Sequence, residues 1–517
     1  MPNLFAYIVL FSYPLVVIIL FRRLPLPQAL VWSIMGGYLF LPERTEIDLP
    51  LLPALDKVLI PSLMAAIMCW LTPPPLQPRR VPPVAAGTSP PARRPRPREK
   101  EKKPFRHNWI ANLCLLMLFI TPIGISMTNN DMVVAGPRVI PGIRTYDIFS
   151  MMLNTAVMLL PFLLARRHLA TQEAHVQLLR AFVAAGLVYS LLILIEIRLS
   201  PQLHRWLYGF HAHLFGQQVR DGGYRPMVFI QHGLRVGLFI LLSVLAAFTL
   251  YRERIASRSA AGKLRGARDT AAAPPQRAAL TFYAFLWLFF ILFMSKTLGA
   301  FMIASLFLPI MFLTKARHWR ILSVVFALAV LVYPMMRSAG LAPVDRMYEF
   351  AQSISADRAK SFKFRLDNED ILLERASEKP LLGWGGWGRS RVYDPVSGKD
   401  LSVTDGTWVI VFGNAGWAGY LAQFGLLTLP AFLYMTSRGA LANSFVTQGL
   451  CVILVVNLID LIPNSGLTPV TWMVTGALLG RYERRPRGDP AKPTPRRRPS
   501  RDEFAAPAPI SGSRSAV

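Results

Sequence analysis

The chain has 517 residues, of which 53% are hydrophobic and 17% are charged, and its formal net charge is +28. So small a share of charged residues excludes an ordinary water-soluble domain of this length. The basic residues gather in stretches that flank apolar segments, as topology signals do in membrane proteins, so the positive charge predicts no nucleic-acid partner.

Apolar segments long enough to cross a bilayer recur along the chain. They predict an all-α fold, a polytopic transmembrane helical bundle of about 12–13 helices with one large extracytoplasmic loop. The segments are 3–21, 28–42, 57–72, 109–127, 148–165, 180–198, 227–250, 279–295, 298–314, 321–337, 412–436, 443–463 and 467–481.

Changes in composition divide the chain into six parts. Two of them are rich in Pro and Arg and lack apolar periodicity, which is typical of disorder. The parts are the N-terminal transmembrane helices (1–72), a disordered basic Pro-rich cytoplasmic linker (73–107), a transmembrane core (108–337), a large periplasmic loop (338–411), the C-terminal transmembrane helices (412–481) and a disordered basic cytoplasmic tail (482–517).

The distribution of Lys and Arg predicts the orientation of the chain. Arg22 and Arg23 follow the first apolar segment, and every alternate loop after them carries Lys or Arg. Basic loops stay in the cytoplasm, so the N-terminus is expected outside and the C-terminus inside. The three cysteines, Cys69, Cys114 and Cys451, lie in apolar segments and are expected to be core residues.

The long loop carries two features of its own. Residues 344–379 combine mixed charge with the apolar spacing of an amphipathic surface helix. Residues 383–388, Gly-Trp-Gly-Gly-Trp-Gly, match a dinucleotide-binding fingerprint without its strand and helix, so that interpretation is rejected. Two alternatives stay open for this stretch, a tight loop whose backbone N–H groups approach an anion and a turn whose tryptophans rest at the membrane interface.

Polar residues inside or beside apolar segments are the candidates for chemistry. Arg225 and Pro226 stand where a loop enters the predicted helix 227–250. His232 and Arg235 are three residues apart and would share a face, with Arg235 about 13 Å inside the helix start. A buried arginine in a membrane helix usually faces a polar cavity, whereas a lone His232 is more often a satisfied core residue.

Further candidates lie in a turn and in the long loop. Lys296 stands between two apolar segments and could bind a phosphate or be a simple turn lysine. Arg365 lies early in the long loop, and Asp405 closes it as a candidate general base or helix N-cap. Asp460, near the end of its helix, is expected to form a structural ion pair with an arginine. The sequence contains no metal-binding motif, and neither a metal nor another cofactor is expected.

Taken in order, several motifs resemble those of the O-antigen ligase and O-antigen polymerase superfamily of bacterial envelopes. The likeness covers roughly residues 109–480. The stretches that carry it are Arg225-Pro226 through Phe229 and His232-Gly233, the turn Ser295-Lys296-Thr297-Leu298-Gly299-Ala300, Phe364-Arg365 through Glu378-Lys379-Pro380-Leu381-Leu382-Gly383-Trp384-Gly385, and Gly419-Tyr420-Leu421-Ala422-Gln423-Phe424-Gly425-Leu426-Leu427. Ligases of this family typically carry His-Asn where this chain has Asp405-Gly406, which favours a polymerase over a ligase.

The resemblance implies a metal-independent glycosyltransferase of the bacterial inner membrane. Its donor would be a polyprenyl-diphosphate-linked glycan, and its product an O-antigen or exopolysaccharide. Arg225, with Arg235 or Lys296 and with His232 nearby, would hold the diphosphate. Arg365 would close the loop, and Asp405 would take the proton of the acceptor hydroxyl. Partners would be the lipid-linked glycan, the bilayer and polysaccharide assembly or chain-length proteins.

Two hypotheses from other classes stay open. One is a polysaccharide or lipid transporter or flippase of the inner membrane, and the other is a structural membrane subunit that recruits partners through its basic tails. Transporters often contain internal repeats, and no convincing repeat is present in this sequence. The single long loop in the second half therefore favours an outward-facing enzyme.

Overall fold

A computed structural model describes residues 1–48, 52–72, 107–220, 222–264 and 275–484. These residues are mostly helical, and seven of the described helices are long and apolar enough to cross a membrane. They are α1 (Leu4–Arg23), α4 (Trp109–Thr128), α5 (Thr145–His168), α6 (Gln172–Leu199), α8 (Gly233–Leu264), α11 (Ala316–Ser338) and α14 (Thr407–Met435). The expectation of a helical bundle is confirmed at this level.

Each of the other predicted apolar segments also forms a helix, but a shorter one. These helices are α2 (Leu26–Phe40), α3 (Leu59–Leu71), α9 (Pro275–Met294), α10 (Leu298–Leu313), α16 (Phe445–Asp460) and α17 (Pro469–Glu483). The two stretches expected to be disordered, 73–107 and 482–517, lie outside the described residues except for His107 and residues 482–484.

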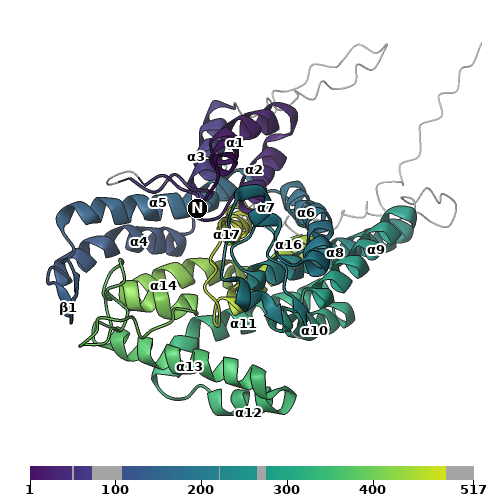
Figure 1. Cartoon of the computed structure of the whole chain (residues 1–517). Coiled ribbons are helices and arrows are strands. Elements are labelled where there is room, and N and C mark those ends of the chain that lie inside the picture. The colour runs from purple at the N-terminus through teal and green to yellow at the C-terminus, as the bar shows by residue number, and fades with distance from the viewer. Residues whose placement is uncertain (49–51, 73–106, 221, 265–274, 485–517) are drawn as a thin grey trace, which may run out of the picture. The chain divides into compact units, whose positions relative to one another are not determined.

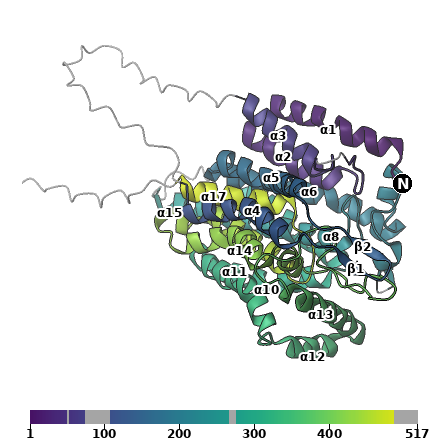
Figure 2. The same ribbon diagram turned by 90° about the vertical axis from the view of Figure 1, so that its left-hand side faces the viewer.

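The loops contain small elements of their own. They are α7 (Leu203–Tyr208), the 3-10 helix η1 (Phe215–Gln218), α12 (Val344–Ile354), α13 (Ala356–Ser377), α15 (Gly439–Ala442), and two antiparallel hairpins, β1 (Val133–Ala135) with β2 (Arg138–Ile140) and β3 (Val219–Arg220) with β4 (Gly223–Tyr224). In Figures 1 and 2, α1, α2 and α3 lie at the top and α12 and α13 at the bottom.

The core of the bundle is built around α8. About nine-tenths of its apolar stretch is buried, and it packs against α6, α9 and α16. By contrast, α1 and α11 turn large apolar side chains outward, among them Leu15, Ile19 and Val325. Such outward faces suit hydrocarbon rather than water. Cys69, Cys114 and Cys451 are buried, as predicted.

Close helix approach at glycines sets the contact between α17 and α5. A Cβ atom added to Gly476 would lie 2.2 Å from the carbonyl oxygen of Phe162, and one added to Gly480 would lie 2.0 Å from that of Arg166. The two glycines are four residues apart and share one face of α17. Small residues at this spacing let membrane helices approach closely.

The predicted amphipathic helix 344–379 is present as two helices. α12 ends at Ile354 and α13 begins at Ala356, with Ser355 in an extended conformation between them. Glu369 of α13 binds residues of α14 and α11. Its carboxylate accepts hydrogen bonds from Trp408 Nε1 (2.9 Å) and the Tyr333 hydroxyl (3.1 Å). The long loop therefore carries a helix that is docked on α11 and α14.

The loop of residues 383–388 and the residues just before it pack against a break in α14. Gly416 has a φ of +59° inside this helix, and a Cβ atom there would lie 2.3 Å from the carbonyl carbon of Leu381. The amides of Trp384 and Gly385 donate to the carbonyl oxygens of Gly413 and Asn414, each at 2.8 Å. These two backbone N–H groups are therefore used within the fold and are not available to an anion.

Candidate functional site

The helix predicted over 227–250 begins later than expected. α8 starts at Gly233, so Arg235 lies in its first turn. The expectation that Arg235 sits about 13 Å inside the helix start is therefore wrong. The physical reason is that the carboxylates of Glu196 and Glu43, not helical carbonyls, accept the backbone N–H groups of Met227, Val228 and Gln231.

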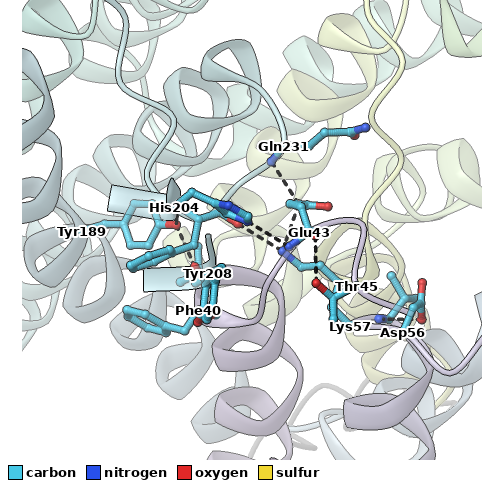
Figure 3. A network of polar contacts seen from close by, with 12 residues as sticks. Phe40, Glu43, Thr45, Asp56, Lys57, Tyr189, His204, Tyr208 and Gln231 are labelled. Atoms are coloured by element: carbon cyan, nitrogen blue, oxygen red, sulfur yellow. Dashed lines mark hydrogen bonds and ion pairs between the residues drawn. The ribbon is translucent and has the colours of Figure 1, made fainter. Parts of the chain in front are cut away.

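Two carboxylates hold this non-helical segment. Glu196 of α6 accepts the N–H groups of Met227 and Val228 through Oε2, both at 2.7 Å. Glu43 accepts the N–H of Gln231 at 3.0 Å and pairs with Lys57 at 2.9 Å, as Figure 3 shows. Hydrogen bonds between an ionised acceptor and backbone N–H groups are strong, so they can impose a conformation that the sequence does not favour locally.

Side chains of α6, α7 and the loop before α3 surround Glu43 and residues 227–231 (Figure 3). Glu43 N donates to His204 Nε2 at 3.2 Å, and Lys57 Nζ donates to the carbonyl oxygen of Phe229 at 3.3 Å. The Tyr189 hydroxyl accepts the N–H of Phe229 at 3.3 Å and donates to the carbonyl oxygen of Leu39 at 2.7 Å. A buried network with so many satisfied partners rigidifies its surroundings. It thereby fixes the two ends of the segment, where Arg225 and His232 stand.

His232 lies among three of the predicted arginines. Burial, followed by the nearby His213, Arg225, Arg235 and Arg365, lowers the pKa of His232 to about 3. The ring centroid of His213 is 4.8 Å away. Nδ1 of His232 accepts the N–H of Leu234 at 3.1 Å, at the start of α8. The imidazole is therefore neutral at neutral pH and carries its proton on Nε2, which can donate to a ligand.

Arg225 and Lys296 each lie against a glycine of this region. Arg225 is 5% exposed, and a Cβ atom on Gly233 would lie 2.4 Å from its aliphatic stem. Lys296 has a φ of +53°, and a Cβ atom on Gly223, two residues before Arg225, would lie 2.5 Å from its Nζ. The turn between α9 and α10 thus brings an ammonium group beside the β4 strand. The absence of side chains at Gly223 and Gly233 makes room for both cations.

Arg365 and Asp405 form an ion pair at the point where the long loop returns to the bundle. Arg365 Nε lies 3.6 Å from Asp405 Oδ2, and both side chains are about one-third exposed. Arg365 Nη1 also donates to Asn464 Oδ1 at 3.1 Å. The N-cap of α14 is Gly406, so the alternative that Asp405 caps this helix is wrong. Its carboxylate faces Arg365 instead.

Asp460 and Arg235 complete the site. Asp460 Oδ1 accepts a hydrogen bond from Asn464 Nδ2 at 3.0 Å, and its carboxylate forms no ion pair with any described residue. The expected structural ion pair is therefore wrong, although Arg365 and Arg235 lie close enough to attract the carboxylate. Arg235 Nη2 donates to the carbonyl oxygen of Ser465 at 3.2 Å. The turn between α16 and α17 thus contacts two of the arginines.

We call Arg225, Arg235, Lys296 and Arg365 the cationic cluster. All the predicted site residues, including His232 and Asp405, belong to it or adjoin it. Guanidinium groups bind phosphate oxygens in pairs, and an ammonium group binds them as a point charge. With Asp405 as a partly exposed carboxylate beside these groups, the arrangement can bind an anion and accept a proton next to it.

Several residues that contribute to the candidate site were not predicted from the sequence. Glu196 carried a usable signal, because a carboxylate inside the apolar segment 180–198 is costly and usually has a function. The sequence gives no such signal for Glu43, His213 or Asn464. Each lies in a polar loop and is positioned by contacts with residues distant in sequence. Within the described residues, no three His, Cys, Asp or Glu side chains gather as ligands for a metal ion.

Comparison of the chain with models of known protein families finds no match, and comparison with curated protein sequences finds none either.

Proposed function

We propose that this chain is a glycosyltransferase of the bacterial inner membrane that acts on a polyprenyl-diphosphate-linked glycan. It would transfer the glycan to an acceptor hydroxyl on the periplasmic side, as a polymerase or ligase of O-antigen or exopolysaccharide synthesis. In this proposal the bundle has about 12–13 spans, a periplasmic N-terminus and a cytoplasmic C-terminus. The loop 338–411 is then periplasmic.

The observation that carries the proposal is the convergence of the three arginines of the cationic cluster on His232. Arg225 follows β4, Arg235 lies in α8 and Arg365 lies in α13, and all three lower the pKa of the same imidazole. Placing like charges together costs free energy, so such an arrangement is expected where an anion is to be bound. A diphosphate linked to a lipid supplies two phosphates at the end of a chain that stays in the bilayer.

The chemistry assigned to the site is a single displacement. The acceptor oxygen forms a bond to the anomeric carbon while the bond from that carbon to the diphosphate oxygen breaks. The hydroxyl proton passes to Asp405, and the polyprenyl diphosphate leaves with the bonding electron pair. Arg225 and Arg235 stabilise the charge that develops on the leaving oxygen. Arg365 holds Asp405 at 3.6 Å and links α13 to the site.

The test replaces site residues in the full chain. It measures the glycan products in a cell whose surface polysaccharide depends on this protein. The variants R225K, R365K and D405N should lose long surface polysaccharide and accumulate short lipid-linked glycan on the periplasmic side. R391Q is the matched control, because Arg391 pairs with Asp400 in the same loop but lies outside the cationic cluster. Wild-type polysaccharide in all three variants would refute the proposal. Accumulation of the glycan on the cytoplasmic side would instead identify a transporter.

A further inference from the structure

A groove between three helices lies far from the cationic cluster. It has a volume of about 490 Å³ and is formed by α6, α8 and α9. Its walls are apolar, with Val183 and Leu187 on one side and Leu250 and Leu280 on the others. Arg180 and Arg254 also line it, on α6 and α8 respectively. The groove therefore combines an apolar surface with two guanidinium groups.

The two arginines stand at the depth of lipid headgroups. Arg254 lies about 31 Å along α8 from Gly233, at ~1.5 Å per residue, which is close to the ~30 Å thickness of the hydrocarbon layer. The same end of α8 carries Arg252, which donates to the carbonyl oxygens of Met311 and Thr314 at the end of α10, each at 2.8 Å. Charged residues thus mark where α8 leaves the apolar stretch.

α6 runs antiparallel to α8 and places Arg180 at the same level. Near one end of the pair, Glu196 binds the backbone before α8, and further along Gly186 packs against Ser243. Arg180 follows at the other end, beside Leu250 and Arg254. The two guanidinium groups therefore lie at the end of the α6–α8 pair that is opposite the candidate site.

The groove is closed toward the middle of the bundle. A Cβ atom on Gly186 would lie 2.7 Å from Ser243 and 3.2 Å from Leu288, so α6, α8 and α9 meet tightly there. Trp287 Nε1 donates to Ser190 Oγ at 2.9 Å one turn further in. The open part runs from Arg180 to Leu187, about 10 Å along the helix. It suits a headgroup with the first methylene groups of its chains.

The charges around the groove favour an anion. Within the part of the chain that the structure describes, Arg180 has no hydrogen bond or ion pair, and its side chain is exposed. Glu253, the carboxylate next to Arg254 on α8, lies by Val446 of α16 and Arg481 of α17. It is thus directed to α16 and α17 rather than into the groove.

We propose that this groove is a binding site for an anionic phospholipid of the surrounding bilayer. The phosphate would lie between Arg180 and Arg254, and the upper acyl chains would lie along Val183, Leu187 and Leu280. Basic pockets between transmembrane helices are suited to acidic headgroups, and each arginine near the surface contributes about 1 kcal/mol, or roughly fivefold in affinity. The bound lipid would fill the gap between α6 and α9 and support the core helix α8.

The experiment measures lipid retention by the purified full chain. The protein is exchanged into micelles with equal amounts of phosphatidylglycerol and phosphatidylcholine, and the retained lipids are quantified by native mass spectrometry. Wild type should retain phosphatidylglycerol preferentially, and R180Q/R254Q should lose this preference by roughly fivefold per arginine. R22Q/R317Q is the matched control, because it removes two exposed arginines that do not line the groove and should behave as wild type.

A second variant keeps both charges. Ala184→Phe fills the groove from its exposed wall and should lower lipid retention even if R180Q/R254Q folds poorly. Equal retention in wild type and A184F, or in wild type and a folded R180Q/R254Q, would overturn the proposal. So would complete displacement of the lipid by millimolar inorganic phosphate. The readout involves no glycan, so its result is independent of the proposed transferase activity.

Discussion

The pKa of His232 depends on the residues that surround its imidazole. Its pKa falls from an ordinary 6.5 to about 3 because burial and nearby cations disfavour the imidazolium. The unfolded chain therefore binds more protons than the folded chain between these two values. The stability linked to this group is fully present above pH 6.5 and is lost as the pH falls toward 3, at about 1.4 kcal/mol per pH unit.

Replacing His232 with Asn should make the protein less sensitive to acid. Asn can still accept the N–H of Leu234 at the start of α8 but cannot be protonated. Between pH 6.5 and pH 5 the wild type should lose roughly 2 kcal/mol more stability than His232→Asn. Melting curves of the full chain in detergent at the two pH values measure this difference. Parallel pH profiles would show that His232 is not held neutral in the folded protein.

The charged residues of the site can be predicted from the sequence, but the residues that position them cannot. Arg225, Arg235 and Lys296 could be found because a charge at the edge of an apolar segment is expensive. Glu43 could not, because the N–H group it accepts belongs to Gln231, 188 residues away. Such contacts depend on tertiary structure, and no local pattern reports them.

At the scale of elements, α13 depends on a buried carboxylate. Glu369 is 8% exposed and accepts Trp408 Nε1 and the Tyr333 hydroxyl, while Arg337 Nε lies 3.5 Å from it. Glu369→Ala would leave these donors buried without an acceptor, at a cost of about 2 kcal/mol or more. Since α13 also carries Arg365, its release would disturb the site.

Hydrogen exchange measures the docking of α13 directly. Glu369→Ala should speed exchange in α13 peptides roughly thirtyfold, with little change in α8 peptides. The matched control is Glu374→Ala, because Glu374 is exposed on the same helix and forms no ion pair with a described residue. Unchanged exchange in α13 of the Glu369→Ala protein would contradict the docking role of Glu369.

Hydropathy predicted where the helices are but not all of their ends. The segments 109–127 and 298–314 match α4 and α10 closely because water and hydrocarbon divide the chain there. The predicted segment 227–250 began too early. Residues 227–230 are apolar, but carboxylates bind the N–H groups of Met227, Val228 and Gln231 before the helix starts. The division of 344–379 at Ser355 was also missed, since mixed charge continues across the break.

At the scale of the whole molecule, α8 joins two sites at its opposite ends. The start of α8 adjoins the cationic cluster, and its far end adjoins the groove of Arg180 and Arg254. The buried stretch between them separates the two sites by about the thickness of the hydrocarbon layer. Sequence charge alone predicted basic residues at both ends, but it could not show that at each end residues from different elements converge.

The most direct test of the central claim is the affinity of the full chain for a polyprenyl diphosphate in nanodiscs. R225K and R365K should each bind about tenfold or more weakly than wild type, because lysine cannot bind phosphate oxygens in pairs. R391Q should bind as wild type does, since Arg391 is engaged with Asp400 outside the cluster. Equal affinity in wild type and in both folded lysine variants would contradict the account.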